Sequence, residues 1–351
     1  MLRCAEITPV AHIVGQREGC PVIKIQPQRI RRALPLLFAL LLFALLMLHS
    51  ASAATAAKQA LVLCAQVLIP SLLPFFVLSG LLSALGLSRA LNRIAAPLMK
   101  KLFSVSGAGA AAFLLGLTGG YPLGAATVRT LYERRELSEA EAARLVCFCN
   151  NSGPAFIVGA AGSGVFGSAK AGLILYLSHL ISAILVGLLF SRSGRKAARE
   201  TGKTASASPV SDFSSAFPEA VHSAVRSTLL ICGYVVVFSV FVGLLDALGI
   251  FSAVSALLST YTPLSAEQSR AILTGFLELG SGVGALQGQS YSPGNLALCA
   301  FMLGWGGVSV FFQSRAVLAG TPLAKAPLAR SKLLHGLFSA PIAAALCILL
   351  H

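Results

Sequence analysis

The sequence predicts an all-α polytopic membrane protein, and three observations predict it. The composition is too apolar for a soluble chain, because 56% of the 351 residues are hydrophobic and only 11% are charged, against about a quarter charged in a globular domain. Several apolar runs reach the length that spans a bilayer as a helix, on the order of 20 residues. Clusters of Gly and Pro interrupt these runs in a repeated order. We therefore expect two pseudo-repeats of four hydrophobic segments each, arranged as inverted repeats with broken or re-entrant helices, after an N-terminal span.

The N-terminal end is compatible with two arrangements. Residues 1–30 are polar and unpatterned, and we expect a cytoplasmic tail there. Residues 31–50 begin with two arginines, continue as an apolar run and end in small residues. This order fits either a retained first span or a cleaved signal-like segment. Both arrangements place residue 55 outside the cell.

The remainder divides into two membrane repeats, residues 60–191 and 223–351, joined by residues 192–222. The joining segment is rich in Ser, Ala, Arg and Lys without apolar periodicity, which is typical of a solvated cytoplasmic linker. We expect each repeat to contain a long helix, two broken segments and a plain helix. The apolar segments that define the repeats are 60–86, 102–126, 143–166, 170–191, 226–250, 270–287, 294–318 and 332–350.

The net charge of +15 comes from Lys and Arg gathered in short clusters between apolar segments. Such clusters orient spans by the positive-inside rule, so the charge does not indicate a nucleic-acid partner. We expect four clusters on the cytoplasmic side, at 89–101, 129–144, 192–203 and 325–332. They share one side only if one broken segment in each half re-enters instead of spanning. The halves then become inverted repeats, as in many secondary transporters.

Glycine-rich breaks interrupt the two middle segments of each repeat, as GLTGGYPLG and CNNSGP in the first and ELGSGVG and GWGGVS in the second. A break inside a bilayer frees N–H and C=O groups that hydrocarbon cannot satisfy. Glycines also serve close helix packing, so one Gly-Gly pair would carry little information. Four such clusters in matched order, with polar neighbours, favour a binding site.

Two breaks are suited to hold an anion. Pro122 and Pro154 stand where a helix would restart, and Ser152 is placed to cap the second restarted helix. A restarted helix presents free N–H groups and the positive end of its dipole at mid-membrane. Asn150 and Asn151 add amide groups, which serve either a ligand or a neighbouring helix. The substrate-binding residues that we expect are Thr118, Gly119, Gly120, Tyr121, Asn150, Asn151, Ser152, Gly153, Ser309 and Gln313.

Glu278 is an acid within an otherwise apolar segment. A charge at the bilayer centre costs about 2.5–3.5 kcal/mol on insertion scales, so such a residue faces a partner or a watery cavity. With Ser281, it is expected to bind a coupling proton or sodium ion, or to contact the substrate. The alternative is a structural ion pair with Arg or Lys. Ser309 and Gln313 stand four residues apart and should share one helix face.

Catalytic and metal chemistry are not expected. The eight cysteines include no C-x-x-C pair and no zinc spacing, and the apolar segments carry no Ser–His or Ser–Lys arrangement. We expect no enzyme, no metal site and no cofactor. His179 is expected to bridge helices, and Ser138 with Glu141 resembles a capping box that begins a helix.

The strings GLTGGYPLGA, CFCNNSGPAFIVGAAG and GGVSVFFQS resemble the YlbJ-type sporulation integral membrane proteins, also called the SpoVV family, over about residues 60–350. This family belongs to the nucleoside-recognition (Gate) domain group, which is similar to parts of concentrative nucleoside transporters. The resemblance implies a transporter of dipicolinic acid in a bacterial cell membrane, the mother-cell membrane around the forespore. A pyridine dicarboxylate also fits the anion site expected at the breaks.

Other functions stay open at this point. A nucleoside or another metabolite of the Gate group would fit nearly as well as dipicolinic acid. A structural membrane scaffold in spore development is the alternative from another class, and it would not need polar residues at the breaks. The expected partners are a small-molecule anion, membrane lipid and a second copy of the chain in a homo-oligomer.

Overall fold

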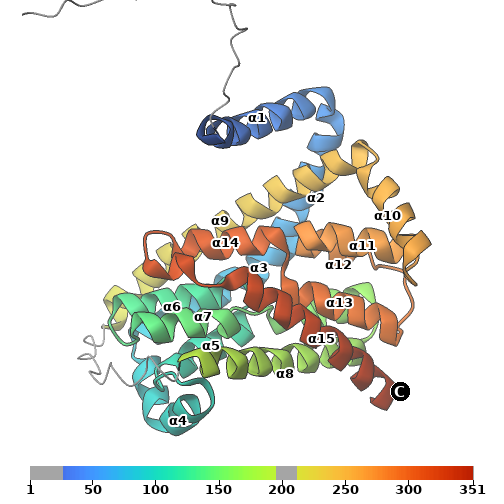
Figure 1. The fold of residues 1–351 in the computed structure, drawn as a ribbon. Coiled ribbons are helices and arrows are strands. Elements are labelled where there is room, and N and C mark those ends of the chain that lie inside the picture. Colours follow the sequence, from blue (N-terminus) through green and yellow to red (C-terminus); the bar gives the residue numbers. More distant parts are fainter. Residues whose placement is uncertain (1–26, 195–211, 351) are drawn as a thin grey trace, which may run out of the picture. The chain divides into compact units, whose positions relative to one another are not determined.

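The computed structural model describes residues 27–194 and 212–350, and every regular element in these ranges is a helix (Figure 1). The chain forms two compact units, residues 1–48 and 49–351. The first unit contains α1 (Pro27–Leu48), an apolar helix whose large side chains are mostly exposed. The predicted tail, residues 1–30, lies outside the described residues except for its last turn, which belongs to α1.

By length and composition, five helices in the described ranges can cross a membrane, and a bent helix pair raises this to six. The bent pair joins 72–84 to 87–103 at an angle of 79°. The five spans are Ser50–Leu68, Ala169–Ser191, Phe213–Ala247, Pro293–Leu318 and Leu328–Leu350. The prediction of an all-α polytopic membrane protein is confirmed.

The two halves of the second unit repeat one order of elements: a long helix, a short helix, two broken pairs and a long helix. The first half comprises α2 (Ser50–Leu63), η1 (Cys64–Leu68), α3 (Ile69–Ala84), α4 (Leu87–Phe103), α5 (Gly109–Gly119), α6 (Leu123–Glu133), α7 (Glu139–Cys149), η2 (Ala155–Val165) and α8 (Ala169–Gly194). The second comprises α9 (Phe213–Ala247), α10 (Ile250–Tyr261), α11 (Ala266–Leu277), α12 (Leu279–Gly284), α13 (Pro293–Trp305), α14 (Gly307–Leu318), η4 (Pro322–Lys325) and α15 (Leu328–Leu350).

Helices α4 and α10 are the elements that the predicted order lacks. Each begins directly after a glycine with a left-handed backbone, Gly86 with φ +92° and Gly249 with φ +70°, a conformation that glycine adopts without steric cost. The basic segment 89–101, expected to be a loop, is part of α4. Its Arg and Lys side chains are exposed while Met99 and Phe103 are buried, which is typical of a helix lying in a membrane interface.

Two helix boundaries differ from the predicted limits of the repeats. The first repeat begins at Ser50 instead of residue 60, because α2 extends into a run of small polar residues. Helix α9 begins at Phe213, inside the segment expected to be linker. Asp212 caps it by accepting the N–H of Ser214 at 3.2 Å, a local stabilisation of the helix start. Of the predicted linker 192–222, residues 195–211 lie outside the described ranges.

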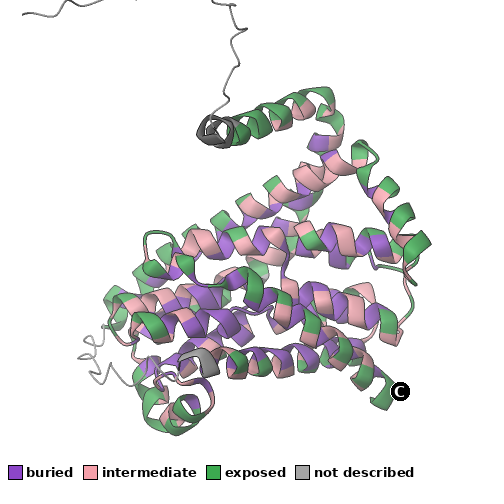
Figure 2. Cartoon of the chain, viewed as in Figure 1, coloured by how far each residue is buried: buried purple, intermediate pink, exposed green. Residues whose placement is uncertain are grey.

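The core of the second unit has three main clusters of buried side chains. One joins α2 and α3 to α9, a second lies among α4 to α8, and a third lies among η2, α8, α13 and α15. Buried residues are dense along these inner helices (Figure 2).

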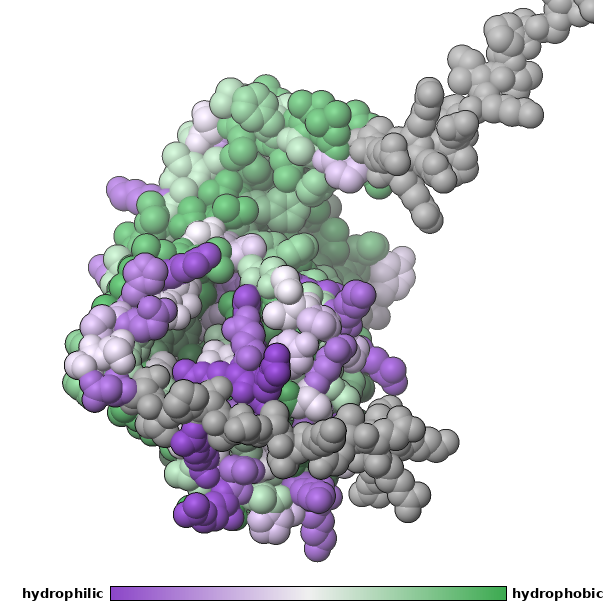
Figure 3. Space-filling view, turned by 90° about the vertical axis from the view of Figure 1, so that its left-hand side faces the viewer, coloured by the Kyte–Doolittle hydropathy of each residue, from purple (hydrophilic) through white to green (hydrophobic). Residues whose placement is uncertain are grey.

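The helix ends that carry the predicted basic clusters lie together at one end of this unit, near α4, the α6–α7 turn and the first turns of α9 (Figure 1). Hydrophilic side chains gather on that face (Figure 3). A shared cytoplasmic side requires this arrangement. That this face lies on the cytoplasmic side of the membrane stays a prediction.

Candidate functional site

Each of the four predicted glycine-rich clusters ends a helix. Helix α5 ends before Gly120, α7 ends before Asn150, α11 and α12 are separated by Glu278, and α13 and α14 are separated by Gly306. Gly306 has φ +81°, a left-handed backbone that favours glycine. The helices therefore break at the glycine-rich clusters, as the sequence predicts.

The two first-half breaks contact each other through glycine. A Cβ added at Gly120 would lie 3.0 Å from the backbone nitrogen of Gly153, and one added at Gly153 would lie 3.1 Å from that of Gly120. At Gly116 and Gly124, an added Cβ would lie only 1.8 and 2.1 Å from the carbonyl oxygen of Cys149. Close approach of backbones accounts for these glycines.

The second-half breaks meet in the same way, and one tyrosine joins the two halves. A Cβ added at Gly307 would lie 3.1 Å from the nitrogen of Leu279 and 3.2 Å from the oxygen of Leu277. The hydroxyl of Tyr121 donates a hydrogen bond to the carbonyl of Leu303 at 3.1 Å. All four breaks thus form one cluster, which we call the break cluster.

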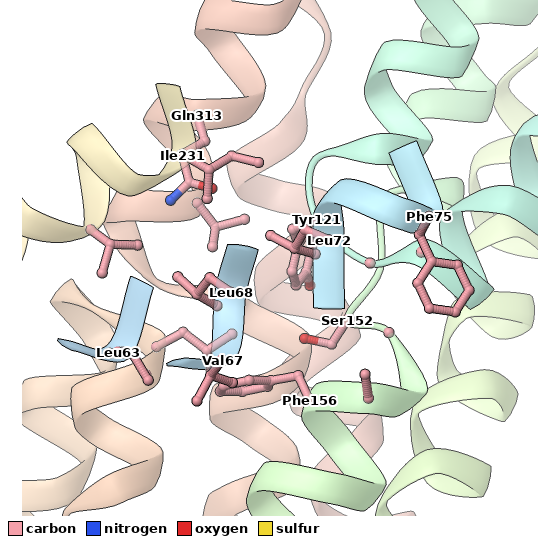
Figure 4. A pocket seen from close by; sticks show the side chains of 18 of the residues that line it. Leu63, Val67, Leu68, Leu72, Phe75, Tyr121, Ser152, Phe156, Ile231 and Gln313 are labelled. Carbon is pink, nitrogen blue, oxygen red and sulfur yellow. The ribbon is translucent and has the colours of Figure 1, made fainter. Parts of the chain in front are cut away.

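A cavity lies between the break cluster and the helices α2–α3 and α9 (Figure 4). Its empty space is about 780 Å³, a figure that includes the part open to the surroundings. The wall from α2, η1, α3 and α9 is apolar and consists of Leu63, Val67, Leu68, Leu72, Phe75, Ile231 and Val235. The opposite wall comes from the break cluster and from the helices that leave it.

Eight of the expected site residues line this cavity, and four do not. Those lining it are Thr118, Gly119, Gly120, Tyr121, Ser152, Gly153, Glu278 and Gln313. Those that do not line it are Asn150, Asn151, Ser281 and Ser309. Of the second group, Asn150, Asn151 and Ser309 are buried.

Asn150 and Asn151 brace the broken end of α7. The amide nitrogen of Asn150 donates to the Ser314 hydroxyl at 2.7 Å, and that of Asn151 donates to the carbonyl of Phe148 at 2.9 Å. Both side chains are buried, and their amide oxygens have no hydrogen-bond partner among the described residues. The Asn150 amide therefore bridges α7 and α14, as the helix-bridging alternative expects, whereas the Asn151 amide turns back to α7.

Ser152 does not cap the helix that follows it. Element η2 begins at Ala155 with Pro154 at its N-cap and with no side-chain cap, so the expected capping role is wrong. The Ser152 backbone N–H donates instead to Nε2 of His179 at 3.1 Å, and its hydroxyl points into the cavity (Figure 4). The carbonyl of His179 lies 3.0 Å from Nε2 of His335. His179 bridges helices, as expected.

Glu278 is held by the start of its own short helix. Its two carboxylate oxygens accept the N–H groups of Gly280 at 3.0 Å and Ser281 at 2.6 Å, and only 3% of the residue is exposed. No Arg or Lys of the described ranges lies within 4 Å of this carboxylate. The alternative of a structural ion pair is therefore not seen, and Ser281 contributes its backbone to the site.

Gln313 presents an amide to the cavity from α14. Its nitrogen donates to the Ser309 hydroxyl at 3.1 Å, so the two side chains share a helix face as predicted. Gly120 and Gly153 also line the cavity, and the described part of the chain provides no acceptor for their backbone N–H groups. The polar wall thus offers both hydrogen-bond donors and acceptors.

The sequence did not predict the apolar wall, because the predicted site residues were the polar residues and glycines at the breaks. A local signal was present in the segment 60–86, where Pro70 and Pro74 stand close together. The helix there widens into the π-helical turn η1 just before Pro70, and Val67 and Leu68 of that turn face the cavity. Short π-helical turns occur often at functional sites.

Comparisons with known proteins show the family of this chain. The family described as Gate, nucleoside recognition, matches residues 65–192, which contain both first-half breaks. The sporulation integral membrane protein YlbJ of Bacillus subtilis (strain 168) is 31% identical over 330 residues, covering 86% of this chain and 79% of that protein. The chain belongs to the YlbJ family. The resemblance expected from the three sequence strings is confirmed, and the protein is an integral membrane protein.

Two solved structures also match, both of double variants of CNTnw in an outward-facing state. One is 14% identical with a TM-score of 0.47, covering 90% of this chain and 84% of that one. The other is 16% identical with a TM-score of 0.44, covering 92% of this chain and 86% of that one.

Proposed function

We propose that this member of the YlbJ family transports a small organic anion, which binds in the cavity beside the break cluster. The observation that carries the proposal is a cavity in which an apolar wall faces Gly120 and Gly153, whose backbone N–H groups have no acceptor among the described residues. A solute with a flat apolar ring and an anionic edge matches both walls. Free backbone N–H groups near the starts of helices are suited to carboxylate oxygens.

The two walls come from different parts of the fold, which supports transport rather than simple binding. The apolar wall belongs to α2, α3 and α9, which share one core cluster with Leu115 of α5 and Leu123 of α6, and the polar wall belongs to the break cluster. A solute held between two groups of helices is released to either side when one group moves against the other. Many secondary transporters bind solute at broken helices near mid-membrane.

The charges around the cavity favour an anion at one end of it. Lys332 lies behind the cavity wall, with its ammonium 5.0 Å from the ring centre of Tyr121. The Glu278 carboxylate repels an anion, although two backbone N–H groups already bind it. We therefore place the anionic edge of the solute at Gly120 and Gly153, away from Glu278.

Dipicolinate is the specific solute that we propose, in the mother-cell membrane that surrounds the forespore. Support comes from membership in a family whose Bacillus subtilis relative is a sporulation integral membrane protein. The chemistry agrees, because dipicolinate joins a flat ring to carboxylates. A nucleoside is the second candidate, favoured by the Gate match and by Glu278, whose carboxylate can accept hydrogen bonds from sugar hydroxyls.

The test compares dipicolinate, uridine and malonate side by side, by binding to the purified protein and by uptake into proteoliposomes. We expect dipicolinate to bind most tightly. Ser152→Ala should weaken it roughly ten- to hundredfold, because a hydrogen bond to a charged group is worth about 1.5–3 kcal/mol. Ser252→Ala, on the exposed side of α10, is the matched control and should bind like the wild type.

The outcomes separate the candidates. Preference for uridine would select the nucleoside and reject the anion. Absence of both binding and uptake for all three solutes, with the protein intact in the membrane, would reject transport of these classes and favour the structural scaffold. Dipicolinate binding that Ser152→Ala leaves unchanged would place the solute elsewhere in the protein.

A further inference from the structure

Lys332 is buried, although its sequence neighbourhood resembles a solvated basic cluster. The residue belongs to the segment 325–332, in which Lys325 and Arg330 are exposed as expected. Only 5% of Lys332 itself is exposed. The assignment of Lys332 to an orienting surface cluster is therefore wrong, and a reason for burying this charge has to be found in its surroundings.

The ammonium of Lys332 has no acidic partner. Its Nζ donates to the carbonyl oxygen of Asn150 and lies 5.0 Å from the ring centre of Tyr121. Among the residues that the structure describes, no carboxylate lies within 4 Å of it. A buried charge without a compensating partner is strongly unfavourable in protein and in lipid. The compensation must come from uncharged oxygens and from the ring.

The broken end of α7 supplies one such oxygen, the carbonyl of Asn150. Asn150 is the C-cap of this helix, Glu139–Cys149, whose last carbonyl groups lack helical partners and carry negative partial charge. The amide oxygens of Asn150 and Asn151 are also buried, and no hydrogen-bond donor of the described ranges, Lys332 included, bonds them. Carbonyl and amide oxygens at the end of a broken helix are the groups with which membrane transporters coordinate a sodium ion.

We propose that Lys332 is a built-in cation: its ammonium stands at the end of α7 where these oxygens would otherwise hold a sodium ion. The protein then needs no sodium at this break, because the chain carries the positive charge permanently. Lys332 does not line the cavity, so its role is to hold Asn150 and the break in place behind the polar wall. The consequence for transport rests on the proposed function, whereas the site itself does not.

The experiment measures thermal unfolding of the purified protein at one pH and constant ionic strength, with choline replaced stepwise by sodium or by methylammonium. Wild type should unfold at the same temperature in all three. Lys332→Ala removes the ammonium but leaves its space and the oxygens. We expect a lower unfolding temperature in choline and a saturable rise of roughly 2 °C or more with sodium or methylammonium.

Two further variants separate the charge from the space that it occupies. Lys332→Met fills the space with an apolar chain, so it should be destabilised and should respond to neither ion. Lys325→Ala removes an exposed lysine from the preceding η4 and should behave as the wild type does. These comparisons distinguish a filled cation site from a general effect of salt.

Two results would overturn the inference. Saturable stabilisation of the wild type by sodium relative to choline would mean that a sodium site is still open, and this measurement needs no variant. The second result concerns Lys332→Ala. If neither sodium nor methylammonium stabilises this variant, or if it cannot be recovered even with methylammonium present, the oxygens do not form a cation site. A failure to transport dipicolinate would count against the proposed function alone, since unfolding is the readout here.

Discussion

Replacing Glu278 by Gln tests whether this buried carboxylate serves the solute or only its own helix. In the structure, one carboxylate oxygen accepts the N–H of Gly280 at 3.0 Å and the other accepts that of Ser281 at 2.6 Å. A glutamine keeps one oxygen as an acceptor and turns the other into an NH₂ group. One of the two N–H groups then faces a donor instead of an acceptor.

The expected loss follows from these two contacts. A hydrogen bond to a charged group contributes about 1.5–3 kcal/mol, and Glu278→Gln removes one such bond and the charge from the other. We expect the free energy of unfolding to fall by about 2 kcal/mol, within that range. If the carboxylate also touches the solute, affinity should change as well, by roughly tenfold for each 1.4 kcal/mol.

The assay combines thermal unfolding of the purified protein with solute binding. Glu267→Gln is the matched control, because Glu267 also stands in the first turn of a helix, α11, but is exposed. Glu267→Gln should change neither the unfolding temperature nor the affinity for the solute measurably. A fall in stability with unchanged affinity would assign Glu278 to helix capping alone.

An unchanged stability would refute the reasoning itself. It would mean that the two N–H contacts to Glu278 do not stabilise α12, and the view of Glu278 as a carboxylate held by its own helix would be wrong. A stability loss accompanied by a change in affinity would place the carboxylate both in the cap and in the site.

The other predictions concern packing, the polar wall and orientation. Gly153→Ala should lower the free energy of unfolding by about 1–3 kcal/mol, because the added Cβ meets the backbone of the neighbouring break at 3.1 Å. Gly159→Ala is the control and should fold normally, because an added Cβ there has nothing within 4 Å. Thermal unfolding measures both variants. Gln313→Leu should abolish solute binding or weaken it at least tenfold with the protein still in the membrane, while Gln287→Leu at an exposed position should not. Glu136→Cys, in the α6–α7 turn of an otherwise cysteine-free protein, should resist a membrane-impermeant thiol reagent in intact cells; labelling there would reverse the predicted orientation.

Local sequence was enough to predict the class of protein and the positions of its breaks. Apolar runs of spanning length leave a helix in lipid as the way to satisfy the backbone. Glycine and proline end helices through their own backbone preferences, so the breaks at Gly120, Asn150, Glu278 and Gly306 follow from nearby residues. The pairing of Ser309 with Gln313 is equally local, because residues four apart share a helix face.

Short amphipathic helices were harder to recognise for a reason that is also local. Helix α4 carries Arg89, Arg93 and Lys100, and clustered charges between apolar runs are typical of loops as well as of interfacial helices. Its bend of 79° from the preceding helix depends on Gly86 and on what the new helix packs against. The charge pattern alone does not distinguish these two outcomes.

Which side chains face the cavity was decided by tertiary structure. Ser152 and Asn151 are adjacent in an irregular segment, where no helical period fixes the direction of a side chain, and one points into the cavity while the other turns back to α7. The apolar wall exists only because α2, α3 and α9 pack beside the break cluster. Lys332 has the sequence neighbourhood of a surface lysine, and its burial against Asn150 depends on a contact between residues far apart in the chain. Such contacts are set by packing across the whole fold, and residue types near one position do not determine them.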